Sequence, residues 1–327
     1  MTRGGADPGA DSTHPPLILR TRIPRLAAGQ PLLAYLLQRF RYLDRAGWLA
    51  EIDAGRVFVD GRLARAEQPL RAGCELAYHK PHQEPRIDRN LRIVEANANF
   101  LVVDKPAHLP MHSDGPFVRN TLVHLLRSGD YPEAELVHRL DRETSGLCVV
   151  ARTAAVRRAL EVQFTKGTVA KAYLAVVRGL VAADFTVDAP IGHAPDSTIA
   201  LRRSAAIGAR EPSPARTDFT VVARGAQHTL LRCVPHTGRT HQIRVHLEHA
   251  GFPLVGDKLY GRPDADYLAF VARVKAGGDA RDVATGEPDR QLLHAAELAF
   301  DEPETGVRRV FHSPLPAAFR AWLDRAP

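Results

Sequence analysis

The sequence of 327 residues predicts an α+β fold: a large mixed, mainly antiparallel sheet with flanking helices, preceded by a small α/β module. Two observations support this prediction. Apolar runs of strand length recur from residue 100 onwards, with helical patterns between them. A polar stretch with two prolines, residues 81–92, separates these runs from a shorter N-terminal segment and is expected to be a linker.

The first sixteen residues are expected to form a disordered leader. Residues 1–16 contain no apolar stretch and include two aspartates, which is unlike a signal or transit peptide. No apolar run in the chain approaches the roughly 18 residues that span a bilayer. We therefore expect a monomer that works in the cytoplasm and has no membrane segment.

Residues 17–80 are predicted to form the small module, with helices followed by a hairpin. Apolar residues at helical spacing extend over 31–48 and are broken by Gly47, and a second short helix is expected over 48–52. The dipeptide Asp60-Gly61, which follows two valines in alternating positions, is a hairpin signal.

The second domain, residues 93–327, is predicted to contain the large sheet. Strand-like runs cover residues 100–103, 146–151, 173–177, 218–222 and 228–234. Helical patterns cover 154–164 and 241–250. Residues 263–290 are rich in Asp, Gly and Arg and interrupt the pattern, so we expect an inserted excursion there.

Positive charge is concentrated in the N-terminal module. The whole chain carries a net charge of +7, which is a weak indication of a polyanionic partner. Residues 17–82 contain eleven Lys or Arg and six Asp or Glu, a net charge of +5. The leader has a net charge of −1, and the remaining 245 residues together hold only +3. Such a distribution is expected of a nucleic-acid-binding module.

The three cysteines are expected to be ordinary core residues. Cys74, Cys148 and Cys233 are too few and too scattered for a disulfide framework or a Cys-based zinc site. A free cysteine usually behaves as a small apolar side chain.

The segment LVHRLDRETSGL, residues 136–147, is the most informative part of the sequence. Asp141 lies between two arginines, just before a Thr-Ser-Gly turn and an apolar strand. Turns at strand ends often display catalytic groups, and flanking cations keep a carboxylate ionised, as a nucleophile or a base requires. Taken alone, the pattern also fits an ion-paired loop.

A second segment, PHTGRTHQIRVHLEHAGFPLVGDKLYG at residues 235–261, contains four histidines, of which His241, His246 and His249 raise the question of a metal site. On a helix His246 and His249 share a face, whereas His241 lies off that face. The chain also contains no HExxH motif, so no metal site is predicted.

Together these segments resemble the RluA-type pseudouridine synthases. HRLDRETSGL has every fixed position of that family's H-R-L-D-x-x-T-S-G-L/I motif, and residues 235–261 resemble its TGRTHQIRVHL…G.P..GD..YG signature nearly throughout. Residues 104–112 and 293–316 resemble its opening and closing segments, although Ala107-His108 replaces the usual Ala-Gly, so the turn there is expected to differ. The resemblance implies a pseudouridine synthase-like fold and isomerisation of uridine to pseudouridine in structured RNA, without a cofactor.

The resemblance also implies roles for individual residues. It places the catalytic aspartate at Asp141 and the base-flipping arginine at Arg139. A K-x-Y segment supplies Tyr173, which would pack against the target base or relay a proton. It pairs Arg244 with Asp141 and leaves Arg239 as a second candidate for contact with RNA or with the aspartate.

The N-terminal module resembles the S-four-like RNA-binding module, through the spacing of its helix and hairpin residues. The arginines that would meet RNA phosphates are Arg39, Arg41, Arg45, Arg56 and Arg62. The alternative is that these are solvated charges on a structural module. Bacterial members with such a module often act on large-subunit ribosomal RNA, so ribosomal RNA is favoured over transfer RNA.

Two other function classes fit the sequence less well. A glycosidase needs two carboxylates that flank the bond, and the motif has no fixed second acid beside Asp141. An RNA-binding or ribosome-assembly factor without activity would not need Asp141, Tyr173 and Arg244 together. The sequence leaves open whether Asp141 attacks the ribose, adds to the base or removes the 2′ proton.

Overall fold

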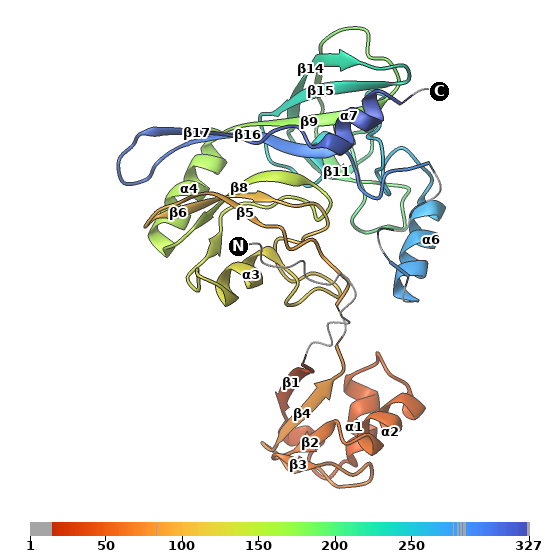
Figure 1. Ribbon diagram of the computed structural model, residues 1–327. Helices are drawn as coiled ribbons and strands as arrows, with labels where there is room; N and C mark the ends of the chain where they lie inside the picture. The colour runs from red at the N-terminus through yellow and green to blue at the C-terminus, as the bar shows by residue number, and fades with distance from the viewer. Residues whose placement is uncertain are drawn as a thin grey trace, which may run out of the picture. The chain divides into compact units, whose positions relative to one another are not determined.

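The computed structural model describes residues 15–325 except 83, 277, 280, 282, 284 and 285. These residues form two compact units, which divide between Glu84 and Pro85 (Figure 1). Most of the predicted leader, residues 1–14, lies outside the described residues. None of the helices in this part of the chain is long and apolar enough to cross a membrane.

The N-terminal unit is a four-stranded antiparallel sheet, in the order β1-β4-β2-β3, with two α-helices. Its elements are β1 (Leu17–Arg22), the 3-10 helix η1 (Arg25–Ala27), α1 (Leu32–Arg39), α2 (Arg45–Asp53), β2 (Val57–Val59), β3 (Arg62–Leu63) and β4 (Glu75–Lys80). Asp60 and Gly61 have φ angles of 47° and 75°, the left-handed pair that a two-residue hairpin turn requires. The predicted hairpin is therefore confirmed.

The single helical stretch predicted over residues 31–48 is wrong, because two helices occupy it. α1 ends at Arg39, and α2 begins after Asp44, whose carboxylate accepts a hydrogen bond from the Gly47 N–H at 2.8 Å. This cap satisfies one of the free backbone donors at the start of α2. Gly47 therefore lies in the first turn of α2 and does not interrupt a helix.

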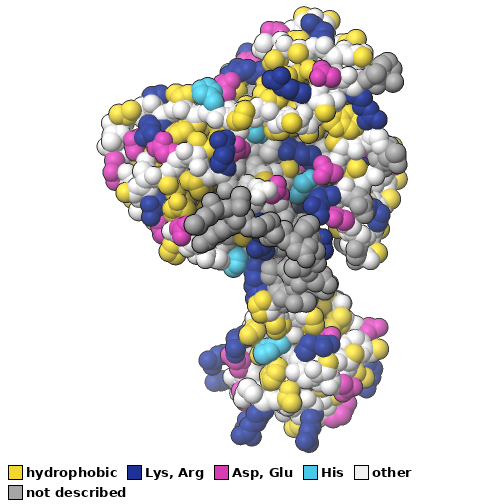
Figure 2. All heavy atoms as spheres, viewed as in Figure 1, with side chains coloured by type: hydrophobic (Ala, Val, Ile, Leu, Met, Phe, Trp, Pro, Cys, Tyr) yellow, Lys and Arg dark blue, Asp and Glu magenta, His cyan; other side chains and the backbone are white. Residues whose placement is uncertain are grey.

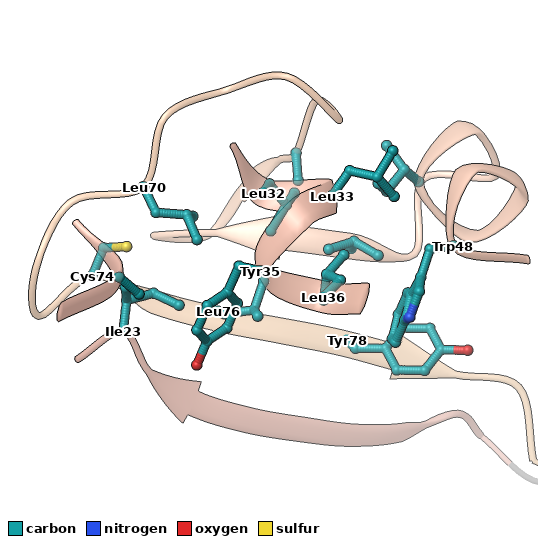
Figure 3. Close-up of a cluster of buried hydrophobic side chains, with 14 residues drawn as sticks. Ile23, Leu32, Leu33, Tyr35, Leu36, Trp48, Leu70, Cys74, Leu76 and Tyr78 are labelled. Carbon is teal, nitrogen blue, oxygen red and sulfur yellow. The ribbon is translucent and has the colours of Figure 1, made fainter. Parts of the chain in front are cut away.

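Trp48 is a fully buried member of the core of this unit (Figure 3). Its fully buried ring packs near Leu36 of α1, and its centroid lies 5.2 Å from that of Tyr78 on β4. The Tyr78 hydroxyl donates to Glu51 at 2.9 Å, and Glu51 accepts two hydrogen bonds from Arg56 at 2.6 and 2.8 Å. The core and this polar cluster together join the two helices to the sheet.

The second unit is built on a ten-stranded, mainly antiparallel sheet, as predicted. The strand order is β10-β14-β15-β9-β16-β8-β6-β5, with β17 paired to β16 and β7 paired to β8. Among the described strands, β8 and β16 form the only parallel pair. The strands are β5 (Arg92–Ala96), β6 (Phe100–Lys105), β7 (Glu135–Leu136), β8 (Ser145–Ala151), β9 (Ala170–Arg178), β10 (Phe185–Asp188), β14 (Arg216–Arg224), β15 (His228–Pro235), β16 (Leu293–Asp301) and β17 (Arg308–His312). A separate small sheet contains β11 (Ile191–His193), β12 (Arg203–Ser204) and β13 (Arg210–Ser213).

Helices cover both faces of the large sheet (Figure 1). They are α3 (Leu122–Ser128), α4 (Ala154–Lys166), α5 (Gln242–His249) and α7 (Ala317–Leu323), whereas α6 (Asp264–Lys275) packs through Tyr267 against the separate cluster of Leu259 and Tyr260. Along β6, Leu101 and Val103 pack with α3, whereas Phe100 and Val102 pack with α4, because successive side chains point to opposite faces. Tyr173 contacts the clusters of both α3 and α5, so these two helices share one face.

Two segments outside the predicted strands are ordered parts of the second unit. Residues 85–92, which the sequence assigns to a linker, pack here, with Ile87 and Leu91 against the α3 cluster. The predicted excursion over 263–290 contains helix α6, whose twelve residues run from Asp264 to Lys275.

The three cysteines are free and buried, as predicted. Cys74 lies in the core of the N-terminal unit, and Cys148 and Cys233 lie in the large sheet. Burial raises the pKa of the Cys148 thiol to about 12, so this group stays protonated at neutral pH.

Candidate active site

The loop between β7 and β8 presents Asp141. On one side of it Leu140 is buried in the α3 cluster. His138 accepts a hydrogen bond from a backbone N–H of β8 at 3.1 Å and stacks on Phe164 of α4, with ring centroids 4.5 Å apart. Burial lowers the pKa of His138 to about 3, so its imidazole is neutral and can accept that bond. These anchors hold the loop while Arg139 stays exposed.

The start of β8 requires glycine at position 146. Gly146 has a φ of 107°, and a Cβ atom there would lie 2.2 Å from the carbonyl oxygen of Ala295 on β16. The two residues face each other in the parallel pairing of β8 with β16. This close approach brings Gln291, just before β16, to the loop that presents Asp141, where its Nε2 donates to Thr144 Oγ1 at 2.8 Å.

Arg244 of α5 is the direct partner of Asp141. Its Nη1 donates to Asp141 Oδ2 at 2.8 Å, so the predicted contact is confirmed. Its Nε and Nη2 donate to the two oxygens of Asp257 at 2.7 and 2.9 Å. Asp257 is buried and also accepts bonds from the N–H groups of Leu259 and Tyr260 at 2.8 and 3.0 Å. A bidentate ion pair therefore fixes the guanidinium that meets Asp141.

Asp257 and Gln291 are site residues that the sequence reasoning missed. Asp257 belongs to the Gly-Asp pair of the 235–261 segment, which was the available signal. The pattern shows that an acid stands there but not which of the nearby cations it binds. Gln291 has no motif of its own, and only the pairing of β16 with β8 brings it within 3.4 Å of Asp141 Oδ2.

Asp141 is held in its ionised form. Burial opposes ionisation, but the charge that His241 carries in acid, the charge of Arg244, and the hydrogen bonds from Arg244 and Gln291 hold the pKa of Asp141 well below its usual range. A quarter of the side chain remains exposed (25%). Oδ2 receives the hydrogen bonds of Arg244 and Gln291, whereas Oδ1 accepts none from the described residues. The site therefore offers a charged carboxylate with one free oxygen.

His241 lies beside this pair and is neutral at pH 7. It opens α5 with a left-handed φ of 59°, and its Nδ1 is hydrogen-bonded to the Tyr260 hydroxyl at 2.8 Å. Burial, and then the charge of Arg244, lower the pKa of His241 to about 4. At neutral pH, Arg244 is therefore the positively charged group that pairs with Asp141.

His241, His246 and His249, the three histidines considered for a metal site, do not meet at one point. His246 is fully buried and is bonded to Thr217 Oγ1 and to the Ala189 carbonyl, at 2.9 and 3.0 Å. Within the described ranges, no group of three His, Cys, Asp or Glu side chains is placed to hold a metal ion.

Tyr173 lies on β9 at the junction of the α3 and α5 clusters. Burial raises the pKa of its phenol, and the negative charge of Asp141 raises it further. The phenol is therefore protonated at neutral pH, which suits stacking or hydrogen-bond donation better than accepting a proton. Its hydroxyl makes no hydrogen bond with the part of the chain that the structure describes.

The Asp-Lys-Pro segment is bonded to the loop that presents Asp141. The ammonium of Lys105 is fully buried and donates to two carbonyls of its own turn, at 2.8 and 2.9 Å, and to the Arg142 carbonyl at 3.2 Å. Desolvation by burial lowers the pKa of Lys105 to about 7. His108 adopts a φ of 62° and is bonded to Asp289 at 3.1 Å, so a histidine takes the left-handed position that usually favours glycine.

Arg239 does not reach Asp141. Its side chain is exposed, and its Nε donates to the Pro214 carbonyl at 3.1 Å. Gln242 fixes this turn by accepting bonds from Thr237 Oγ1 at 2.6 Å and from the Arg239 N–H at 3.0 Å. Contact of RNA with Arg139 or Arg239 stays a prediction.

The five arginines predicted for RNA contact in the N-terminal unit fall into two groups. Arg39, Arg41, Arg45 and Arg62 are exposed, and no carboxylate among the described residues lies within ion-pair distance of them. Figure 2 shows Lys and Arg side chains projecting from this unit into solvent. Arg56 instead binds Glu51, and 35% of its side chain is exposed.

Known proteins match this chain over most of its length. A family model described as RNA pseudouridylate synthase matches residues 99–249. Ribosomal large subunit pseudouridine synthase D of Pseudomonas aeruginosa is 35% identical, and the match covers 92% of this chain and 93% of that protein. The protein of the same name from Nitrosomonas europaea is 34% identical, over 89% of this chain and 82% of that protein. Among solved structures, human RNA pseudouridylate synthase domain containing 1 is 30% identical with a TM-score of 0.55, over 71% of this chain and 86% of that chain.

Proposed function

The chain belongs to the family of RNA pseudouridine synthases, which isomerise uridine in RNA, and we propose that Asp141 is its catalytic group and ribosomal RNA its substrate. The geometry of Asp141 carries this proposal. Its carboxylate is ionised, Arg244 fixes one oxygen at 2.8 Å, and the other oxygen is free on a partly exposed side chain.

The reaction breaks the glycosidic bond, turns the uracil and rejoins it through carbon 5. The free Oδ1 of Asp141 can attack the anomeric carbon, add to the ring or remove the 2′ proton. Each of these routes needs an ionised carboxylate in a fixed orientation. Arg244 and Asp257 supply that orientation, because Arg244 is already fixed by its two bonds to Asp257.

The neighbouring residues suit a base that has left its stack. Extruding a nucleotide costs a few kcal/mol, which contacts in the site must offset. Arg139 is exposed in the same loop as Asp141 and can fill the vacated space or hold a phosphate. The protonated phenol of Tyr173 can stack on the uracil.

Ribosomal RNA is favoured by two observations. Both bacterial relatives described above are named for the large ribosomal subunit. The N-terminal unit presents exposed arginines without acidic partners among its described residues, as an S-four-like module that contacts RNA phosphates would. We expect the protein to act as a monomer in the cytoplasm.

The test is tritium release from RNA that carries the label at carbon 5 of uracil. We expect wild-type protein to release tritium from an unmodified large-subunit ribosomal RNA transcript and far less from transfer RNA transcripts. Release from transfer RNA alone would contradict the proposed substrate. Free uracil as product would indicate a glycosidase, and binding without release would indicate an RNA-binding factor.

A further inference from the structure

The backbone of His241 is held in an unfavourable conformation beside Asp141. His241 precedes α5 with a left-handed φ of 59°, which is uncommon for a residue other than glycine. Its carbonyl accepts a hydrogen bond from the Val245 N–H at 2.9 Å, so the first turn of α5 fixes it. Backbone in this region persists where the surrounding structure holds it, and it is frequent at functional sites. The conformation of His241 therefore indicates a role in the site.

The hydrogen bonds of Tyr260 determine which nitrogen of His241 carries the proton. The Tyr260 hydroxyl is buried and accepts a bond from the Arg203 N–H at 3.1 Å. Its own proton needs an acceptor, because a buried hydroxyl without one is costly. Among the described residues that acceptor is His241 Nδ1, at 2.8 Å. The imidazole is neutral at pH 7, since burial lowers the pKa of His241 to about 4. A neutral ring that accepts at Nδ1 carries its proton on Nε2.

The ion pair that orients Asp141 also holds Tyr260. The Tyr260 N–H donates to Asp257 Oδ1 at 3.0 Å, and the centroid of its ring lies 4.8 Å from the Arg244 guanidinium carbon. Arg244 in turn donates to Asp141 Oδ2 at 2.8 Å. One network therefore fixes the carboxylate of Asp141 and, through Tyr260, the imidazole of His241.

The Nε2–H group of His241 and the free oxygen of Asp141 are separated by more than a hydrogen bond. His241 Nε2 lies 3.9 Å from Asp141 Oδ1. An N–H···O bond measures about 2.7–3.2 Å, so a third atom that lies within this distance of both groups can bond to both. The side chains are 13% and 25% exposed, which leaves each of them open to a substrate.

The chemistry of the two groups restricts what the third atom can be. It must accept a hydrogen bond from the imidazole and donate one to the carboxylate. A hydroxyl does both, whereas the carbonyl oxygens of uracil and the oxygens of phosphate only accept, and the N3–H group of uracil only donates. Within an RNA chain the 3′ and 5′ oxygens are esterified, so the hydroxyl that a nucleotide offers is the one at carbon 2′.

We propose that His241 binds the 2′-hydroxyl of the target uridine: Nε2–H donates to this hydroxyl, which itself donates to Asp141 Oδ1. Carbon 2′ adjoins the anomeric carbon, so the bridge holds the reacting part of the ribose against Asp141. A carboxylate oxygen has two lone pairs, so Oδ1 keeps one for the reaction. That the ligand is a uridine of RNA rests on the proposed function, whereas the facing pair of His241 and Asp141 rests on the geometry alone.

The binding test compares two RNAs on each protein. Both have the sequence of an RNA that wild-type protein converts, and the converted position carries either uridine or 2′-deoxyuridine. Isomerisation leaves the 2′-hydroxyl in place, so turnover during the measurement does not remove the group under test. The proteins are the full-length wild type, His241→Leu, His241→Gln and the control His249→Leu, a histidine that is exposed at the end of α5.

The expected result is a loss of discrimination in His241→Leu. For the wild type, 2′-deoxyuridine should weaken affinity about 5- to 50-fold, because two hydrogen bonds are lost. In His241→Leu this ratio of affinities should be about 2- to 10-fold smaller, whereas His241→Gln, which keeps an N–H donor, and His249→Leu should stay near the wild-type ratio. The ratio is taken within one protein, so a general loss of RNA affinity cancels. Equal affinities of wild type for the two RNAs, or equal ratios in wild type and folded His241→Leu, would overturn the proposal.

A second measurement concerns the tautomer and needs no RNA. In protein labelled with nitrogen-15 at histidine, the two ring nitrogens of His241 should give the shifts of a neutral ring that is protonated at Nε2. The chain has 15 histidines, so the signal is identified by its loss in His241→Gln. Tyr260→Phe removes the donor to Nδ1 and should let the other tautomer appear. A His241 ring protonated at Nδ1 in the wild type would overturn the proposal even where the variants fail to fold.

Failure of this proposal is distinguishable from failure of the proposed function. The affinity ratio and the tautomer need no turnover, so they report on His241 whether or not uridine is isomerised. Absence of tritium release by wild-type protein contradicts the function. Normal release together with equal affinities for the two RNAs contradicts only the role of His241.

Discussion

Four arginines of the N-terminal unit and Arg244 of the second unit lie in opposite environments. In the N-terminal unit, Arg39, Arg41, Arg45 and Arg62 stay in solvent without carboxylate partners among the described residues. In the second unit, Arg244 is buried between two carboxylates that it binds at 2.7 to 2.9 Å. Solvated charges attract a polyanion over a distance and are screened by salt, whereas a buried ion pair fixes geometry and is little affected by salt. The first arrangement suits binding, and the second suits catalysis.

The largest effect is expected at Asp141. Asp141→Asn removes the charge and the free carboxylate oxygen but keeps the shape, so single-turnover rates should fall more than about a thousandfold. RNA affinity should remain, since the exposed arginines are untouched. The control is Asp218→Asn, a partly exposed carboxylate on β14 that is bonded to His236. A rate above one tenth of wild type in Asp141→Asn would refute the catalytic assignment.

Arg244→Met should have the next largest effect. It keeps much of the side-chain length but removes the charge that holds the pKa of Asp141 low. The acidic limb of the pH–rate profile should therefore move to higher pH, and the plateau should fall about tenfold to a hundredfold through misplacement of Asp141. An acidic limb and plateau identical to wild type would show that Arg244 does not govern Asp141.

The same pairing predicts a pH dependence of stability. Because the folded-state pKa of Asp141 is depressed, the pairing stabilises the fold above the unfolded pKa of about 3.9. That contribution is lost as pH falls through the lower, folded value. Urea unfolding of wild type and Arg244→Met at pH 7 and in acid should show the difference between them shrinking as pH falls. A constant difference would indicate that packing alone is lost.

Asp257 should affect stability more than chemistry. Asp257→Ala leaves Arg244 without its bidentate partner and should lower the free energy of unfolding by about 3–5 kcal/mol, with a smaller loss of rate than Arg244→Met. Asp301→Ala is the matched control, because its ion pair with Arg308 at 3.1 Å is exposed and should contribute about 0–1 kcal/mol. Equal losses of stability in the two variants would mean that the buried pair has no special role.

The smallest effects are expected in the N-terminal unit, and they separate its arginines. Each of Arg39→Gln, Arg41→Gln, Arg45→Gln and Arg62→Gln should reduce the slope of log affinity against log salt by about 1. Arg56→Gln should instead lower stability by about 1 kcal/mol, because Arg56 is bonded to Glu51, and should leave the slope unchanged. If only Arg56→Gln changed the slope of log affinity against log salt, Arg56 would contact RNA and the four exposed arginines would not.

The sequence was most informative where a local pattern coincides with a local structure. The strands around 100–103 and 146–151 and the hairpin at Asp60-Gly61 were predictable, because apolar runs and turn residues act over a few positions. The start of α2 was missed, since a single hydrogen bond from the Gly47 N–H to Asp44 decides it. Helix α6 was missed because the Asp, Gly and Arg residues of 276–290 dominated the composition of the 263–290 segment, although Asp264–Lys275 itself is largely apolar.

The motif residues of the active site were predictable from the sequence, whereas the residues that hold them in place, Asp257 and Gln291, were not. Asp141 and Arg244 stand in strings that resemble a known family, so their contact could be predicted from 103 residues apart. The partner of Asp257 depends on how α5 lies against the turn that follows it, and sequence spacing does not encode that. Gln291 reaches Asp141 only through the pairing of two strands that are distant in the chain.

Gly146 has a consequence for how this enzyme can change over evolution. Any side chain there would meet the Ala295 carbonyl at 2.2 Å and force β16 away from the catalytic loop. At other glycines, such as Gly251, an added Cβ would have no atom within 4 Å. In a saturation library selected for activity, position 146 should return glycine alone, and position 251 should tolerate asparagine. New substrate specificities are therefore expected to arise in peripheral segments such as α6. The junction of β8 and β16 is not expected to tolerate substitution.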